Sequence, residues 1–244
     1  MNVRPRLAIP RPARAFLALL LALPAAGVNL ACAAAVEAGG GSLPALATEV
    51  RQVIHGAAGA ATSGAGTTGL RWESLGASLG DYASNPGADP LKYESSRIAA
   101  RRILAHGPTG PQSPDLTSRW LEEAAGRLEA QAAVEPGLRE AERRDLALYS
   151  LQARFHAARL IAAVHYNLFR RALSLAELYA ATQQEQRAVG HWRELVKRAG
   201  AHPDAARWNE ELQRLEASLR DLESQCCPPG KVHLESPIWQ PDRS

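Results

Sequence analysis

A long, nearly uncharged helical stretch at the centre of the chain constrains the fold most. Between Leu146 and Phe169 the only fully charged residues are Arg154 and Arg159. At 100° per residue, the apolar positions of this stretch fall on two faces of one helix. These positions are Leu146, Ala153, Ala157, Leu160, Val164 and Leu168 on one face, and Leu148, Leu151, Phe155, Ala158, Ala162 and Phe169 on the other. We therefore expect a helix over residues 138–172 with neighbours on more than one side.

Capping residues and helix breakers predict four further helices around this one. The start signals are Asp89-Pro90, Ser113-Pro114, the capping-box pattern Ser174-Leu175-Ala176-Glu177, and Asp204. The stop signals are Gly107-Pro108, Pro136-Gly137, Gly200 with Pro203, and Pro228-Pro229-Gly230. Long helices joined by short loops favour antiparallel neighbours. The sequence thus predicts an all-α protein, an antiparallel bundle of about five helices with a flexible N-terminal linker and an extended C-terminal tail.

The N-terminal 35 residues have the pattern of an export signal. Four arginines precede the apolar run Phe16–Leu23, and small residues follow at Ala31–Ala35. We expect residues 1–35 to be the signal peptide and 36–88 a Gly/Ala/Ser-rich linker with room for one short helix. Residues 89–225 would then form the bundle, and 226–244 the tail. The predicted location is periplasmic or extracellular.

The charge of the chain argues against a nucleic-acid partner. Its 28 Lys and Arg and 25 Asp and Glu give a net charge of +3. The signal segment holds four of those arginines and no acid, so the remainder carries 24 cations against 25 anions. A nucleic-acid binder keeps a basic surface after processing, and this chain has no such excess.

The three cysteines raise separate questions. Cys32 lies at the junction that follows the signal, where it is either removed by cleavage or becomes a lipid anchor, the one route by which we expect contact with a membrane. Asn29 stands at the third position before Cys32, where lipoprotein signals usually carry an aliphatic residue, so we favour ordinary cleavage. Cys226 and Cys227 are adjacent and cannot bridge each other without strain. In an oxidising compartment they could form an intermolecular disulfide, or remain thiols in the tail.

One side of the helix 138–172 carries the best candidate site. Polar side chains recur there at steps of three and four residues, and we call them the polar stripe: Tyr149, Gln152, His156, Arg159, Tyr166 and Arg170. A histidine can act as acid or base near neutral pH, and an arginine can bind a carboxylate or phosphate. The stripe is therefore either a ligand-binding pocket or the solvent-facing side of a helix whose polar side chains lie over the core.

Other catalytic and metal motifs do not assemble. His156 and His165 are nine residues apart, no H-E-x-x-H pattern occurs, and we expect no metal or cofactor. Trp120, Trp192 and Trp208 could form a carbohydrate platform, but each lies on an apolar helix face and is better explained by core packing.

Two helical segments resemble a known group of proteins. The run Asp145–Leu160, and His191–Leu195 followed by Ala199-Gly200, are similar to C-terminal helical regions of large exported bacterial, planctomycete-type, glycoside-hydrolase-like proteins. The resemblance covers about residues 138–222 and implies an accessory helical region beside a catalytic barrel. The chain has no room for such a barrel of about 250 residues, so the family's catalytic residues have no counterpart here.

These observations favour an exported, non-enzymatic protein with an interaction or accessory role. The partner would be a protein or a glycan, in association with carbohydrate-active proteins. Two alternatives stay open: a ligand-binding or hydrolase-related pocket on the polar stripe, and a carbohydrate-binding module.

Overall fold

The part of the chain that the structure describes is entirely helical. The computed structural model describes residues 42–58, 78–110 and 112–226, and these contain seven helices and no strand. The helices are α2 (Leu43–Ala58), α3 (Leu79–Ser84), α4 (Ser96–Leu104), α5 (Pro114–Val134), α6 (Glu140–Ala172), α7 (Leu175–Ala199) and α8 (Ala205–Cys226). The all-α class expected from the sequence is confirmed.

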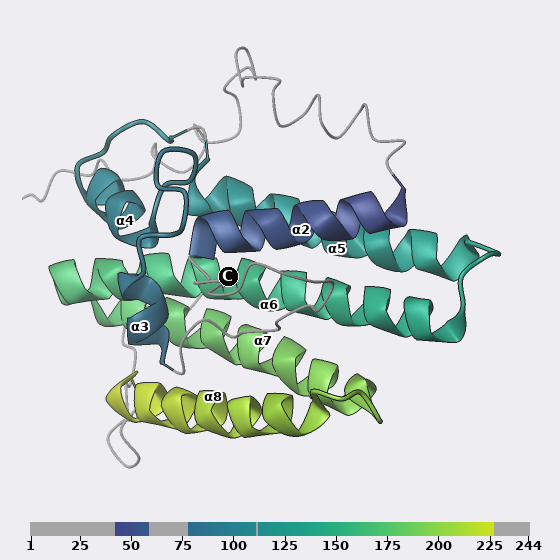
Figure 1. Ribbon diagram of the computed structural model, residues 1–244. Coiled ribbons are helices and arrows are strands. Elements are labelled where there is room, and N and C mark those ends of the chain that lie inside the picture. Colours follow the sequence, from purple (N-terminus) through teal and green to yellow (C-terminus); the bar gives the residue numbers. More distant parts are fainter. Residues whose placement is uncertain (1–41, 59–77, 111, 227–244) are drawn as a thin grey trace, which may run out of the picture. The chain divides into compact units, whose positions relative to one another are not determined.

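Helix α6 is the centre of the arrangement. It packs most extensively against α7 and α5, and also against α2, α3 and α4, while α8 packs mainly on α7. The four longest helices therefore follow one another in a row, in the order α5, α6, α7 and α8 (Figure 1). Both apolar faces predicted for α6 are buried, apart from the half-buried Phe169. The wide apolar surface of α6 thus has neighbouring helices on several sides, as its sequence pattern required.

The helix count differs from the five expected, because α2 and α3 both lie in the range 36–88. Helix α2 buries Leu46, Val50 and Ile54 against the core, and packs on α5 and α6. The surrounding Ala and Gly content is typical of a linker, but small residues also permit close packing. A Cβ at Gly56 would clash with the ring of Tyr93, so this glycine serves a close contact and not a flexible connection.

The predicted bounds of α7 are confirmed, although its start has a different cause. The helix runs from Leu175 to Ala199, preceded by Ser174. Ser174 makes no side-chain capping hydrogen bond, so the capping box is not formed. The Glu177 carboxylate instead lies 2.6 Å from His165 Nδ1 on α6, where it joins the two helices. The seam residues Trp192 of α7 and Trp208 of α8 are fully buried, and Trp192 Nε1 donates to the Trp208 carbonyl.

Several sequence predictions fall on residues outside the described part. These are the signal peptide with Cys32, residues 36–41 and 59–77 of the linker, Cys227 and the rest of the tail. Among the described helices, none is both long and apolar enough to cross a membrane.

The packing of α6 and α8 leads to a direct stability prediction. Leu160→Ala or Leu215→Ala should lower the free energy of unfolding by about 2–5 kcal/mol, because each removes a buried side chain and leaves a cavity. Urea denaturation measures this. Leu91→Ala is the control, since Leu91 is 99% exposed and its truncation should change stability by less than about 0.5 kcal/mol. An unchanged midpoint for Leu160→Ala would show that the assigned α6 face is wrong.

Candidate functional site

The structure divides the polar stripe into a buried centre and a more open end. Tyr149, Gln152, His156 and Arg159 are buried, and His156 and Arg159 have no exposed surface at all. Tyr166 is half-buried, and Arg170 at the end of α6 is exposed. One of the two arrangements expected for the stripe was a solvent-facing side of the helix. The centre of the stripe does not have that arrangement, because it is buried.

Arg159 forms a fully buried ion pair with Glu185 of α7. Its Nε lies 3.0 Å and 3.3 Å from the two carboxylate oxygens, and the two side chains are 0% and 1% exposed. The guanidinium also lies over the ring of Tyr82 from α3, with 4.9 Å between Cζ and the ring centroid, and 5.3 Å from the ring of Phe155. Charge pairing and cation–π contact together stabilise a cation that burial alone would make very costly.

His156 lies beside this pair and is bonded to the same tyrosine. Tyr82 Oη and His156 Nδ1 are 3.2 Å apart, and the imidazole tautomer decides which of them donates. The Phe155 ring packs edge-to-face on the His156 imidazole, and the Trp192 ring packs on Phe155 in turn. His156 therefore has aromatic neighbours as well as Tyr82. We call Tyr82, His156, Arg159 and Glu185 the buried quartet.

Burial dominates the electrostatics of the quartet. It raises the pKa of Tyr82, with the Arg159 charge opposing the rise, so the phenol keeps its proton at neutral pH. Burial also raises the pKa of Glu185, and the Arg159 guanidinium beside the carboxylate opposes that rise without cancelling it. Towards the other end of the stripe, burial raises the pKa of Tyr149 to about 12, against the effect of nearby Arg51.

A second buried polar contact joins α6 to α3 and α4. Asn167 Nδ2 donates to the Ala83 carbonyl at 3.0 Å and to Ser96 Oγ at 3.1 Å, and Ser96 Oγ donates to the same carbonyl. Asn167 is 5% exposed. This contact fixes the short helices on α6 and thereby places Tyr82 of α3 beside His156 and Arg159.

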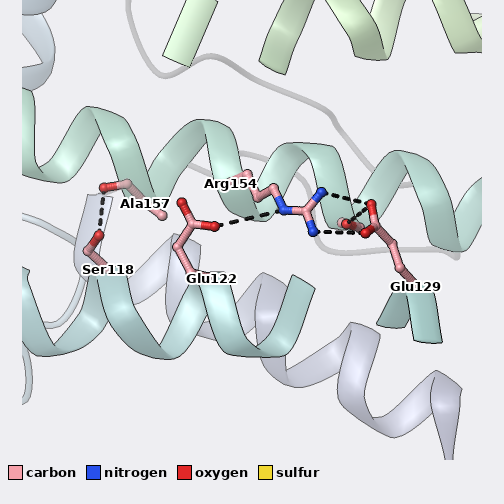
Figure 2. A network of polar contacts seen from close by, with 6 residues as sticks. Ser118, Glu122, Glu129, Arg154 and Ala157 are labelled. Atoms are coloured by element: carbon pink, nitrogen blue, oxygen red, sulfur yellow. Dashed lines mark hydrogen bonds and ion pairs between the residues drawn. The ribbon is translucent and has the colours of Figure 1, made fainter. Parts of the chain in front are cut away.

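A third network lies on the α5 side of α6 and contains its other internal arginine. Arg154 donates two parallel hydrogen bonds to the Glu129 carboxylate, at 2.9 Å and 2.8 Å, and its Nε is 3.8 Å from Glu122. Figure 2 shows Arg154 between the two glutamates, with Ser118 bonded to the Ala157 carbonyl further along the same interface. Burial would raise the pKa of Glu129, but its hydrogen bonds from Arg154 and Ser150 outweigh burial and lower it.

Sequence reasoning found two members of the quartet and missed the other two. Glu185 had a signal, because it occupies a position of the α7 seam whose other members are apolar or small: Leu178, Thr182, Val189, Trp192, Val196 and Ala199. A charge at a seam position predicts a buried partner on the facing helix. Tyr82 had no such signal in the sequence, since α3 lies in a short, turn-rich segment.

Cys226, predicted as a disulfide candidate, lies at a groove between α7 and α8. The groove has a volume of about 480 Å³, and its lining includes Tyr179, Gln183, Arg220 and Glu223. Tyr179 is 53% exposed, and Gln186 Nε2 donates to Glu223 across the groove at 2.8 Å. This groove is a different place from the buried quartet.

The quartet has the residue types of a catalytic site and lacks access to solvent. An acid–base pair and a cation are brought together, but all four side chains are directed at one another inside the core. Within the described residues, no group of three or more His, Cys, Asp or Glu side chains is placed to hold a metal.

Comparison of the chain with protein-family models, with curated protein sequences and with solved structures finds no match.

The buried ion pair generates a test by substitution. Glu185→Gln should lower the free energy of unfolding by about 3–5 kcal/mol, because it leaves the Arg159 charge buried without a counter-charge. Combining Glu185→Leu with Arg159→Met removes both charges and should recover most of that loss. Urea denaturation of Glu185→Leu, Arg159→Met and the double variant gives the coupling between the two residues.

The matched control is the exposed ion pair of Arg193 and Glu216 between α7 and α8, whose side chains are 60% and 31% exposed. Glu216→Gln should cost less than about 1 kcal/mol. Equal losses for Glu185→Gln and Glu216→Gln would contradict the role given to the buried pair.

The lowered pKa of Glu129 predicts how its contribution changes with pH. The folded state favours the ionised carboxylate, so this stability is fully present above the usual carboxyl pKa of about 4.3 and is lost as the pH falls through the lower folded value. The difference in unfolding free energy between wild type and Glu129→Gln should therefore be constant near neutrality and shrink in acid. The exposed Glu123 of the same helix is the control, and Glu123→Gln should follow wild type. A Glu129→Gln difference that grows in acid would refute the assignment.

Proposed function

We propose that this chain is an exported, non-enzymatic protein built as a helical bundle, with an interaction or accessory role. Its partner would be another protein or a glycan, in the setting of carbohydrate-active proteins that the resemblance of residues 138–222 implies. The proposal joins an export signal to a rigid helical body.

One observation supports the non-enzymatic part most strongly. The residues best suited to catalysis, His156 and Arg159, are fully buried and bonded to Tyr82 and Glu185. A general acid or base must come within hydrogen-bond reach of substrate, and these groups lie in the core with no exposed surface. Their positions are those of a polar contact that specifies how three helices pack, a use for which buried charges are known in other proteins.

The alternative of a ligand pocket on the stripe needs an opening beside His156 and Arg159. The described groove instead lies between α7 and α8, so the pocket alternative has less support than the non-enzymatic one. The proposal that the chain is exported depends on residues 1–35, and it is independent of whether the polar stripe forms a pocket.

The experiment has two arms, one for each part of the proposal. The first is mass spectrometry of the chain recovered from a bacterial envelope or medium, where we expect the N-terminus to lie near Ala34 or Val36, after loss of Cys32. A chain recovered only inside the cell with residues 1–35 intact would overturn export, and a lipid on Cys32 would replace secretion with anchoring.

The second arm screens the purified protein for hydrolysis of glycosides and related substrates. We expect no turnover above the background of the host. Turnover that is lost in His156→Gln or Arg159→Lys, in variants whose circular dichroism matches wild type, would overturn the non-enzymatic assignment.

A further inference from the structure

Helix α4 presents an outward face on which arginines and large aliphatic side chains alternate. Ser96, Ala99 and Ala100 form its buried side, and the two alanines pack on Val164 and Leu168 of α6. We define the α4 surface as the exposed residues on and before this helix: Leu91, Arg97, Ile98, Arg101, Ile103 and Leu104. The four aliphatic side chains are 99%, 49%, 42% and 45% exposed.

The charge around this surface is concentrated and positive. Residues 91–113 contain four Lys or Arg and one acid, Glu94. That acid is occupied by Arg102, whose Nε and Nη2 donate to its two oxygens at 2.9 Å and 3.1 Å. Arg97 and Arg101 remain exposed on the outer side. Within residues 91–113 the cations therefore outnumber the acids by three.

The surface is held rigidly before any partner arrives. Ser95 caps α4 by accepting from the Ile98 N–H, the Arg102–Glu94 pair joins the helix to the preceding loop, and Asn167 bonds Ser96 from α6. A free amphipathic peptide must become ordered when it binds, whereas α4 is already helical. The side chains are therefore presented without that ordering cost.

We propose that the α4 surface docks the protein on an anionic phospholipid bilayer. Arginine binds lipid phosphates through its planar, multiply donating head group, and clustered cations are attracted to the negative surface potential. Ile98 and Leu104, which share the outer side of α4 with the two arginines, are suited to enter the boundary between head groups and acyl chains. A nucleic acid or an acidic protein would satisfy the arginines but leave these aliphatic side chains without an apolar environment, which is why a bilayer fits better.

This inference goes beyond the proposed function and does not rest on export or on a lipid at Cys32. It is tested with the purified full chain and vesicles, so a failure here leaves the proposed function standing, and the reverse is also true.

The test combines vesicle sedimentation with hydrogen–deuterium exchange. Vesicles of phosphatidylcholine alone are compared with vesicles that also contain phosphatidylglycerol. We expect binding to the second kind only, weakening as salt is added. Because residues 1–35 of the full chain are themselves apolar and basic, exchange provides the local readout: amides of residues 96–104 should exchange more slowly with anionic vesicles.

Two variants separate the electrostatic and apolar parts. Arg97→Glu with Arg101→Glu should weaken the α4-dependent binding roughly 10- to 50-fold, and Ile98→Ser with Leu104→Ser should weaken it roughly tenfold. Arg187→Glu with Arg214→Glu makes the same charge change on α7 and α8, and Val134→Ser removes an aliphatic side chain that is 78% exposed at the far end of α5. Both controls should leave vesicle protection of α4 unchanged.

Several outcomes would overturn the proposal. One is unchanged exchange in residues 96–104 when anionic vesicles are present. Another is equal binding to neutral and anionic vesicles. A third is an equal loss in the Arg187 and Arg214 control, which would mean that overall charge and not the α4 surface is responsible.

Discussion

The buried pairing of Arg159 with Glu185 is the contact on which the arrangement of the helices depends. Taking each charge out of water costs several kcal/mol, and only a well-formed pair offsets that cost. A shift of α7 along α6 by one turn would separate Nε from the carboxylate that now lies 3.0 Å away. Apolar contacts tolerate small displacements far better, since they are not directional. The pair therefore selects one register among several that would bury similar apolar area.

The same logic extends to the other side of α6. Its two internal arginines face different neighbours, because Arg154 pairs with Glu129 of α5 and Arg159 with Glu185 of α7. The difference lies in burial: the Arg154 pair is partly open to water and gives Glu129 a lowered pKa, whereas burial raises the pKa of Glu185. One contact contributes stability through charge pairing, and the other mainly restricts which packing is allowed.

Most helix bounds and buried faces were accessible from the sequence because they depend on local periodicity. The exception is the helix expected to start at Asp89-Pro90, which begins only at Ser96 after the Ser95 cap. Leu175–Ala199 was predicted at both ends, and the faces of α6 were assigned correctly. The polar partners were not identified, because local periodicity does not reach Tyr82, which lies 74 residues from His156, or Glu185, which lies 26 residues from Arg159. Glu185 could have been found as the charged member of an otherwise apolar seam. The short helix allowed for within residues 36–88 is α2, but its place in the core was obscured by composition, since alanine and glycine such as Gly56 are equally typical of linkers and of closely packed helices.

The division between interior and surface shapes the functional argument. A polar stripe at helical spacing suggests a site only when its side chains can contact a ligand. Here His156 and Arg159 are buried and hold the helices together. Asn167 and Ser96 extend that interior to α4, so the contact that orders the core also holds Arg97, Arg101 and their aliphatic neighbours outward. A helix this short would not persist alone in water. The buried polar contacts therefore keep the outer face of α4 in one conformation, which the proposed docking on a bilayer requires.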